Sequence, residues 1–233
     1  MGAKKSTESQ YEFLESSDAL ANQLDKAQSF VQSNNKLFLV IGGVLLVGIL
    51  AFVGFHYYQD SRESEAQKAL YKAIYDFEAD SLNLALNGKG GNEGLLAIAD
   101  NYGSTNAGKL ANFYAGVALL KEGKYDDAIA RLKAYSSSDL LLQARAYALI
   151  GDAFMEKGDY KEAISYYKRA ADYKPNQFFT PGYLLKLGLA YEKNNQIQEA
   201  APVYKRIIDE FPMSSEVMNA KKYLGVVEGQ VGK

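Results

Sequence analysis

The chain has 233 residues, a formal net charge of −2 and one histidine. It contains no cysteine, which excludes disulfides, thiolate metal sites and cysteine nucleophiles. It also lacks the excess of basic residues that nucleic acid or an anionic membrane surface would require, so we expect no nucleic-acid partner.

Residues 1–36 are polar, with the apolar side chains Phe13, Leu20, Leu24 and Val31 at roughly helical intervals. This spacing predicts a short amphipathic helix. Such a segment more often rests on a surface, or is partly disordered, than it forms a specific docking element. We therefore expect residues 1–36 to form a separate polar segment.

Residues 37–58 form an uncharged apolar run. Because about 20 helical residues cross the ~30 Å hydrocarbon layer of a membrane, this run is long enough to span one. The rival interpretation is a cleaved signal peptide, but the run is longer than such peptides carry and no clear small-x-small cleavage site follows it. We predict an uncleaved transmembrane helix, with the aromatic residues Phe55, Tyr57 and Tyr58 at the lipid–water boundary.

Residues 59–107 are expected to connect this helix to the rest of the chain. Apolar residues at helical spacing predict a helix from about residue 60 to residue 85. Glycines between residues 88 and 94 then predict a flexible loop. This segment is not a phosphate-binding loop, because it lacks the Gly-Lys-Ser/Thr ending of that motif. A short helix is predicted from Leu95 to Asp100, which makes residues 60–101 a candidate degenerate repeat.

A pattern then recurs through residues 108–233. Gly116, Gly151 and Gly188 are each followed twelve residues later by an alanine and sixteen residues later by a large residue. The alanines are Ala128, Ala163 and Ala200, and the large residues are Leu132, Tyr167 and Tyr204. The glycine spacings of 35 and 37 are close to the period of tetratricopeptide repeats, about 34 residues. The first copy departs from the pattern, with Asn112 and Ala115 where bulkier residues are usual.

Each repeat is expected to be a pair of antiparallel helices, whose small residues let the backbones approach while the large residue fills the space beside them. Gly151→Leu should therefore disrupt packing. Gly123, Gly158 and Asn195 fall at the turns inside the pairs, where a positive φ is needed. After Pro212, the remaining chain suffices for one capping helix. The predicted fold is all-α: a single N-terminal transmembrane helix, then a tetratricopeptide solenoid of about three repeats plus a cap.

Catalytic chemistry finds little support in this sequence. His56 lies in the aromatic boundary segment, and a lone histidine without cysteines cannot build a metal site. The acidic pairs Asp126-Asp127 and Asp209-Glu210 are typical of a solvated helix face, because adjacent helical residues point about 100° apart. Nucleophile-elbow, zinc-protease and dinucleotide motifs do not occur. We expect a protein that is not an enzyme and has no cofactor or metal.

The first helices of stacked pairs form a surface that commonly binds protein segments. The repeat register places nine side chains on it: Phe113, Val117, Lys121, Ala148, Asp152, Met155, Leu185, Leu189 and Glu192. We expect about half of them to pack against neighbouring helices and the others to line a peptide groove of mixed apolar and charged character. Replacing Phe113 or Leu189 by Asp should then weaken partner binding and leave helicity intact. The Lys and Asn of a carboxylate clamp are absent, because Phe113 and Val117 hold their places.

A polar N-terminus, one membrane anchor and a short repeat domain resemble the YfgM-like family of bacterial inner-membrane proteins. The resemblance rests on residues 107–116, residues 209–216 and residues 220–225. The glycine-rich insertion and residues 184–192 resemble the versions found in the Bacteroidetes.

This resemblance implies an inner-membrane anchor with a cytoplasmic N-terminus and a periplasmic repeat domain. Charge alone favours the orientation with the N-terminus inside only weakly. The implied partners are Sec translocon components, a membrane-anchored prolyl isomerase-like chaperone, or newly exported polypeptides. Two functions stay open: an accessory or chaperone-like factor of the Sec translocon in protein export, and a structural scaffold of another envelope complex, such as outer-membrane assembly or division.

Overall fold

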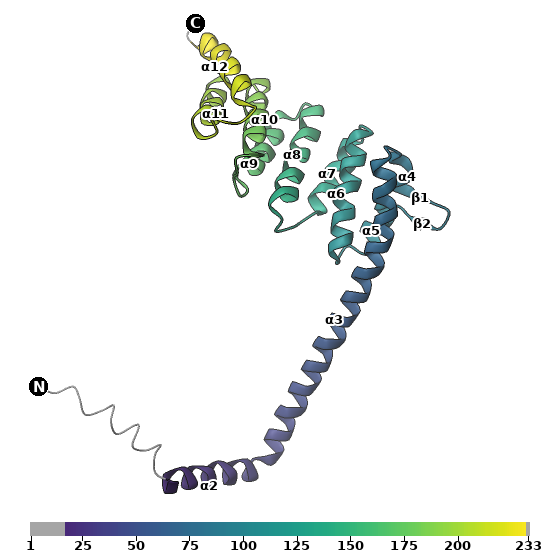
Figure 1. Cartoon of the computed structure of the whole chain (residues 1–233), viewed down its shortest axis with the longest axis vertical. Helices are drawn as coiled ribbons and strands as arrows, with labels where there is room; N and C mark the ends of the chain where they lie inside the picture. The colour runs from purple at the N-terminus through teal and green to yellow at the C-terminus, as the bar shows by residue number, and fades with distance from the viewer. Residues whose placement is uncertain (1–16, 232–233) are drawn as a thin grey trace, which may run out of the picture. The chain divides into compact units, whose positions relative to one another are not determined.

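The computed structural model describes residues 17–231, and helices make up most of that range (Figure 1). The chain divides into two compact units, Met1–Tyr58 and Gln59–Lys233. One long helix, α3 (Asn35–Glu78), contributes residues to both units.

The first unit contains α2 (Ser17–Ser33) and the first part of α3. Helix α2 confirms the amphipathic helix predicted within residues 1–36, although Phe13 lies outside the described residues. Leu20, Leu24 and Val31 are exposed on α2. The rings of Phe30 and Phe38 meet edge to face at 6.1 Å, across the junction between the two helices.

The apolar part of α3 buries none of its side chains. All the large apolar residues from Leu37 to Tyr58 are exposed, and the helix is long and apolar enough to cross a membrane. The core helix of a soluble domain would bury such side chains against its neighbours. The structure therefore agrees with the predicted helix that could span a membrane.

The last part of α3 belongs to the second unit, where Ala66, Leu70 and Ala73 are buried in one core cluster with α5 and α6. The predicted helix over residues 60–85 is interrupted, because α3 ends at Glu78 and Asp80 takes a positive φ of 54°. Aspartate tolerates this conformation better than most residues. The chain then resumes as α4 (Leu82–Asn87).

The glycine-rich segment is a β-hairpin and not the flexible loop that we expected. Strand β1 (Gly88–Lys89) pairs antiparallel with β2 (Asn92–Glu93). Gly90 and Gly91 between them have φ values of 63° and 83°, which is the pair of positive φ angles that a type I′ turn requires. Helix α5 (Leu95–Asn101) follows and confirms the predicted short helix.

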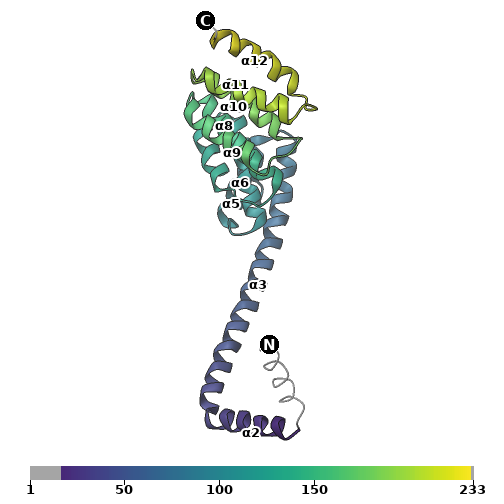
Figure 2. The same cartoon turned by 90° about the vertical axis from the view of Figure 1, so that its left-hand side faces the viewer.

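Three helix pairs and a final helix complete the second unit (Figures 1 and 2). The pairs are α6 (Asn106–Lys121) with α7 (Tyr125–Ala134), α8 (Leu140–Glu156) with α9 (Tyr160–Asp172), and α10 (Thr180–Lys193) with α11 (Ile197–Glu210). Helix α12 (Val217–Val231) packs on α11 at the end of the stack. This arrangement confirms the all-α solenoid with about three repeats and a capping helix.

The contact between a small and a large residue is present in each pair. A Cβ atom added to the glycine would lie 2.5 Å from Leu132 at Gly116, 2.6 Å from Tyr167 at Gly151 and 2.3 Å from Tyr204 at Gly188. These distances are far shorter than a van der Waals contact between carbons. The two backbones of each pair therefore approach as closely as the absence of a Cβ atom allows.

The turns inside the pairs also follow the sequence. Gly123, Gly158 and Asn195 have φ values of 75°, 74° and 58°, as predicted. Each residue lets the first helix end and the second begin after a few residues, so the two helices lie antiparallel.

Carboxylates accept hydrogen bonds from free N–H groups at the starts of α6, α8 and α9. The Asp139 carboxylate accepts hydrogen bonds from Leu141 and Leu142 at the beginning of α8, both at 2.8 Å. These backbone donors hold the pKa of Asp139 below its ordinary value. At the start of α6 the carboxylate comes from a distant helix, because Glu63 of α3 accepts from Asn106 N–H at 2.7 Å. That hydrogen bond fixes the end of α3 to the first helix pair.

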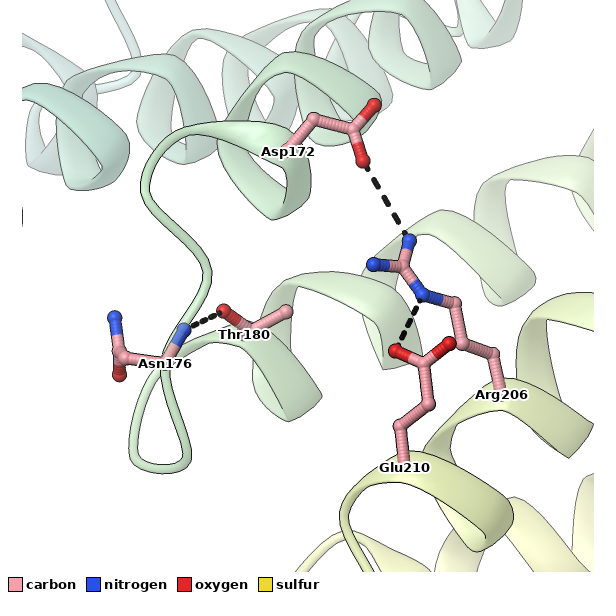
Figure 3. A network of polar contacts seen from close by, with 5 residues as sticks. All are labelled: Asp172, Asn176, Thr180, Arg206 and Glu210. Carbon is pink, nitrogen blue, oxygen red and sulfur yellow. Dashed lines mark hydrogen bonds and ion pairs between the residues drawn. The ribbon is translucent and has the colours of Figure 1, made fainter.

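Ion pairs join successive repeats. They are Arg131–Asp100, Lys157–Asp126, Lys186–Asp152 and Arg206–Asp172. Their partners lie 31 or 34 residues apart, about one repeat. Figure 3 shows Arg206 between Asp172 of α9 and Glu210 of its own helix; the two contacts measure 3.5 and 2.9 Å. The same view shows the buried Thr180, whose hydroxyl oxygen accepts the Asn176 N–H at 2.8 Å. Exposed ion pairs of this kind stabilise the fold only weakly. Their spacing of about one repeat nevertheless favours one alignment of each helix pair against the next.

Candidate protein-binding site

A pocket of about 600 Å³ opens on the side of the repeat domain formed by the first helices α6, α8 and α10, which we call the first-helix face. Its lining residues are Leu120, Tyr125, Asp152, Met155, Glu156, Tyr167, Lys186 and Leu189. Apolar walls with a few polar groups are typical of ligand pockets, and this volume lies in their usual range.

The structure brings together three residues of the predicted peptide groove in this pocket: Asp152, Met155 and Leu189. The other predicted groove residues lie outside it. Val117 and Leu185 are half-buried and pack against the core, as we expected for part of the set. The exposed Lys121 pairs with Asp80 at 2.9 Å, and the half-buried Glu192 accepts a hydrogen bond from Tyr204.

The prediction for Phe113 was wrong. Its side chain is only 4% exposed, and its ring lies 5.3 Å from the ring of Tyr135 and 5.7 Å from that of Tyr114. Ala148 is buried as well. Both residues occupy the part of the first helix that contacts neighbouring helices, so neither lines an open groove.

The polar part of the pocket is built around Asp152. Its carboxylate accepts hydrogen bonds from the Tyr167 hydroxyl at 2.7 Å and from Lys186 Nζ at 2.6 and 2.7 Å. Burial, reinforced by the negative charge of Asp152, raises the pKa of Tyr167 far above its ordinary value. The phenol therefore stays protonated and donates its hydrogen bond at neutral pH. The Lys186 charge compensates that of Asp152, so this carboxylate is already partnered.

The third repeat has a related arrangement. The Tyr204 hydroxyl donates to Glu192, and burial followed by this contact raises the pKa of Tyr204. The Tyr204 ring also lies 5.6 Å from Tyr223 of α12. In the first repeat the large residue is Leu132, which has no hydroxyl. The tyrosine–carboxylate contact thus belongs to the second and third repeats.

The sequence pattern did not indicate Lys186 or the role of Tyr167 in the pocket. Tyr167 was visible in the repeat pattern, where we assigned it to packing alone. Lys186 lies outside the register that we used for the first-helix face. Its separation of 34 residues from Asp152, one repeat length, is the signal that could have identified the pair.

Exposed apolar residues also occur in the segments where one helix pair leads into the next helix. We call these residues, taken together, the inter-repeat edge: Leu140, Leu141, Phe178, Phe179 and Met213. Phe178 is 84% exposed and Met213 is 94% exposed. The Asn176 side chain accepts the N–H groups of Phe178 and Phe179 at 3.0 and 2.9 Å, and this turn precedes α10.

Comparison with known proteins supports the repeat assignment. Tetratricopeptide-repeat models match residues 115–177 and residues 183–214. A matching solved structure from Podosopora anserina is described as a kinesin light chain with nearly identical TPR-like repeats. It is 14% identical, covers 73% of this chain and 88% of its own, and has a TM-score of 0.56. At this identity the likeness concerns the fold alone. A search of curated proteins finds no match.

The matched residues fall on the helix pairs described above, so these pairs are tetratricopeptide repeats. Such repeats are scaffolds for protein–protein interaction and are not an enzymatic fold type. In this chain the tetratricopeptide repeats follow a helix that is long and apolar enough to cross a membrane.

Proposed function

We propose that this chain is a membrane-anchored protein that binds polypeptide segments through its first-helix face. The observation that carries the proposal is the pocket containing Met155 and Leu189, in a chain whose helix α3 exposes a full span of apolar side chains. In this proposal residues 1–36 are the polar N-terminal segment, residues 37–58 the anchor, residues 59–107 the connection and residues 108–233 the repeat domain.

The exposed part of α3 supports anchoring. Burying one large aliphatic or aromatic side chain away from water is worth about 1.5–3 kcal/mol, and residues from Leu37 to Tyr58 present many of them without a protein partner. Lipid would cover that surface. On the family resemblance, we place the anchor in a bacterial inner membrane, with the N-terminus in the cytoplasm and the repeats in the periplasm.

The pocket favours a peptide ligand with an apolar side chain. Leu120, Met155 and Leu189 supply apolar walls, while Glu156 and Lys186 place charges of both signs around them. Methionine adapts to ligands of different shape, which suits contacts of low sequence selectivity. Anchoring would confine this pocket to the membrane surface and raise its effective concentration there.

We further propose that the ligand is a component or client of protein export. The chain would act as an accessory or chaperone-like factor of the Sec translocon and contact translocon subunits, a membrane-anchored prolyl isomerase-like chaperone, or newly exported polypeptides. The YfgM-like resemblance supports this finer assignment. The alternative is a structural scaffold of another envelope complex, and the exposed inter-repeat edge favours it, because Phe178 and Met213 offer a second contact for assembly.

Co-purification of the full-length protein from its native membranes tests this proposal. After mild solubilisation and mass spectrometry, we expect translocon subunits with the wild-type protein and fewer of them with Leu189→Asp. Recovery of a different envelope complex, without translocon subunits, would contradict the export role and favour the scaffold role. Equal recovery of partners by wild type and Leu189→Asp would contradict binding at the first-helix face.

A further inference from the structure

A second pocket, of about 530 Å³, lies at the start of the repeat domain and is lined by α5, α6 and α7. We call it the second-helix pocket. Its lining residues are Leu96, Asn112, Leu119, Asp127, Ala130, Arg131 and Ala134. The first-helix pocket contains none of these residues, so the two sites are separate.

The corresponding space in the next repeat is filled. Counted from the signature glycine, Asn112 corresponds to Tyr147, and Ala134 corresponds to Arg169. In the second repeat the Arg169 guanidinium lies over the Tyr147 ring, 4.2 Å from its centroid. The third repeat also has a large residue at this position, Leu184, which is fully buried. Asn112 and Ala134 therefore leave open a space that the second repeat closes with Tyr147 and Arg169.

Two further positions repeat this difference. Leu119 and Arg131 correspond to Phe154 and Tyr166 of the second repeat, whose rings stack with centroids 5.6 Å apart. The second repeat thus has an aromatic cluster where the first repeat has an aliphatic residue and a guanidinium. The Arg131 guanidinium is held in place by Asp100, with contacts of 2.6 and 3.3 Å.

Asn112 also has an unmet hydrogen bond. It is only 6% exposed, and its amide nitrogen donates a long hydrogen bond of 3.4 Å to the Gly108 carbonyl. Only the nitrogen of the amide can donate to a carbonyl, which assigns the other atom as the oxygen Oδ1. Among residues 17–231, Oδ1 has no hydrogen-bond partner and is shielded from solvent. A buried acceptor without a donor is unfavourable, so a donor placed in this pocket would be stabilised.

We propose that the second-helix pocket binds a tyrosine or tryptophan side chain of another polypeptide. The aromatic ring takes the space that Tyr147 occupies in the second repeat, against Leu96 and Leu119. A small rotation of the Asn112 amide lets Oδ1 accept the phenol O–H or indole N–H. Arg131 contacts the ring as Arg169 contacts Tyr147, an arrangement favoured between guanidinium and aromatic groups. Phenylalanine lacks the donor and binds more weakly.

The absence of tryptophan from the chain allows a direct test. The full-length protein in lipid nanodiscs is titrated into N-acetyl-tryptophanamide, and the anisotropy of the indole fluorescence is followed, with empty nanodiscs as the blank. We expect saturable binding, with displacement by N-acetyl-tyrosinamide at lower concentrations than by N-acetyl-phenylalaninamide. Asn112→Leu, which removes the acceptor, should weaken binding about three- to tenfold, as expected for one lost hydrogen bond.

Two more variants complete the test. Asn112→Tyr should fill the pocket as in the second repeat, abolish probe binding and raise the melting temperature. Leu189→Asp, on the first-helix face, should leave the titration unchanged. No saturable binding to the wild type, or unchanged binding to Asn112→Leu, overturns the proposal. Because Leu189→Asp should lose partners in co-purification and keep the probe, failure of this inference is distinguishable from failure of the proposed function.

Discussion

The close contact between Gly188 and Tyr204 makes the sign of one substitution predictable. Alanine usually stabilises a helix relative to glycine, by about 0.5–1 kcal/mol. At position 188 the new Cβ atom would stand 2.3 Å from Tyr204 Cε1 and 2.6 Å from Cζ. Tyr204 is fully buried, with its hydroxyl bonded to Glu192 and its ring beside Tyr223. The ring therefore has no free space to enter.

The expected cost follows from these contacts. Overpacking a core costs about 1–3 kcal/mol, and displacing the Tyr204 hydroxyl from Glu192 forfeits about 0.5–1.5 kcal/mol more. After the helix-propensity gain is subtracted, Gly188→Ala should destabilise the domain by about 0.5–4 kcal/mol. At about 2–4 °C per kcal/mol for a domain of this size, the melting temperature should fall by about 1–16 °C.

Thermal unfolding of the full-length protein in one detergent, followed by circular dichroism, measures this shift. Gly225→Ala in α12 is the matched control, because no atom lies within 4 Å of its added Cβ, and it should gain about 0.5–1 kcal/mol. In a Tyr204→Val background the obstructing ring is gone, so Gly188→Ala should become stabilising. If Gly188→Ala is as harmless as Gly225→Ala in the wild-type background, the close-packing argument is refuted.

Three other predictions concern the site and the helix starts. Phe113→Asp should abolish cooperative unfolding, because even truncation of a buried phenylalanine costs about 3–5 kcal/mol. Leu189→Asp should instead keep its helicity and lose partner binding. Circular dichroism measures the helicity of both variants, and co-purification measures their partner binding. Asp139→Ala should cost about 0.5–2 kcal/mol through loss of the α8 cap, measured by thermal unfolding. The folded pKa of Asp139 is lowered, so its charge contributes fully above about pH 4 and is lost as the pH falls through the folded pKa. Relative to Asp139→Asn, which caps without titrating, the wild type should therefore lose stability on acidification; a constant difference from pH 7 to pH 3 would contradict this. Lys186→Met should lower stability by less than about 1 kcal/mol, because its pair with Asp152 is partly exposed, and that difference should shrink in high salt.

The repeat architecture could be predicted because it depends on covalent geometry. Only glycine allows the close approach of the two helices seen at Gly151, and few residue types tolerate the positive φ angles at Gly158 and Asn195. The residue types at these positions therefore indicate the repeat. The end of α3 gave no such signal. Apolar periodicity continues past Glu78, and a single residue, Asp80, interrupts the helix by taking a positive φ. Gly90 and Gly91 indicated a turn, but strands of two residues are too short to show an alternating pattern.

The site was only partly predictable, because the register fixes a helix face and not what covers it. Phe113 and Leu189 have similar apolar character, yet Phe113 packs against Tyr135 while Leu189 lines the pocket. That difference depends on the neighbouring helix pair. Asn112 was visible as a departure from the repeat pattern. Its consequence, a pocket with an unpartnered acceptor, required the coordinates of α5 and α7.

Site-specific photo-crosslinking in the native membranes tests the central claim most directly. In three separate variants, a photoreactive residue would replace Leu189 on the first-helix face, Phe178 at the inter-repeat edge, or Ser165 on α9. The exposed Ser165 is the control position. Our account predicts polypeptide adducts from position 189 and none from position 165. Adducts from position 178 alone, with position 189 silent, would contradict the claim that the first-helix face binds the partner.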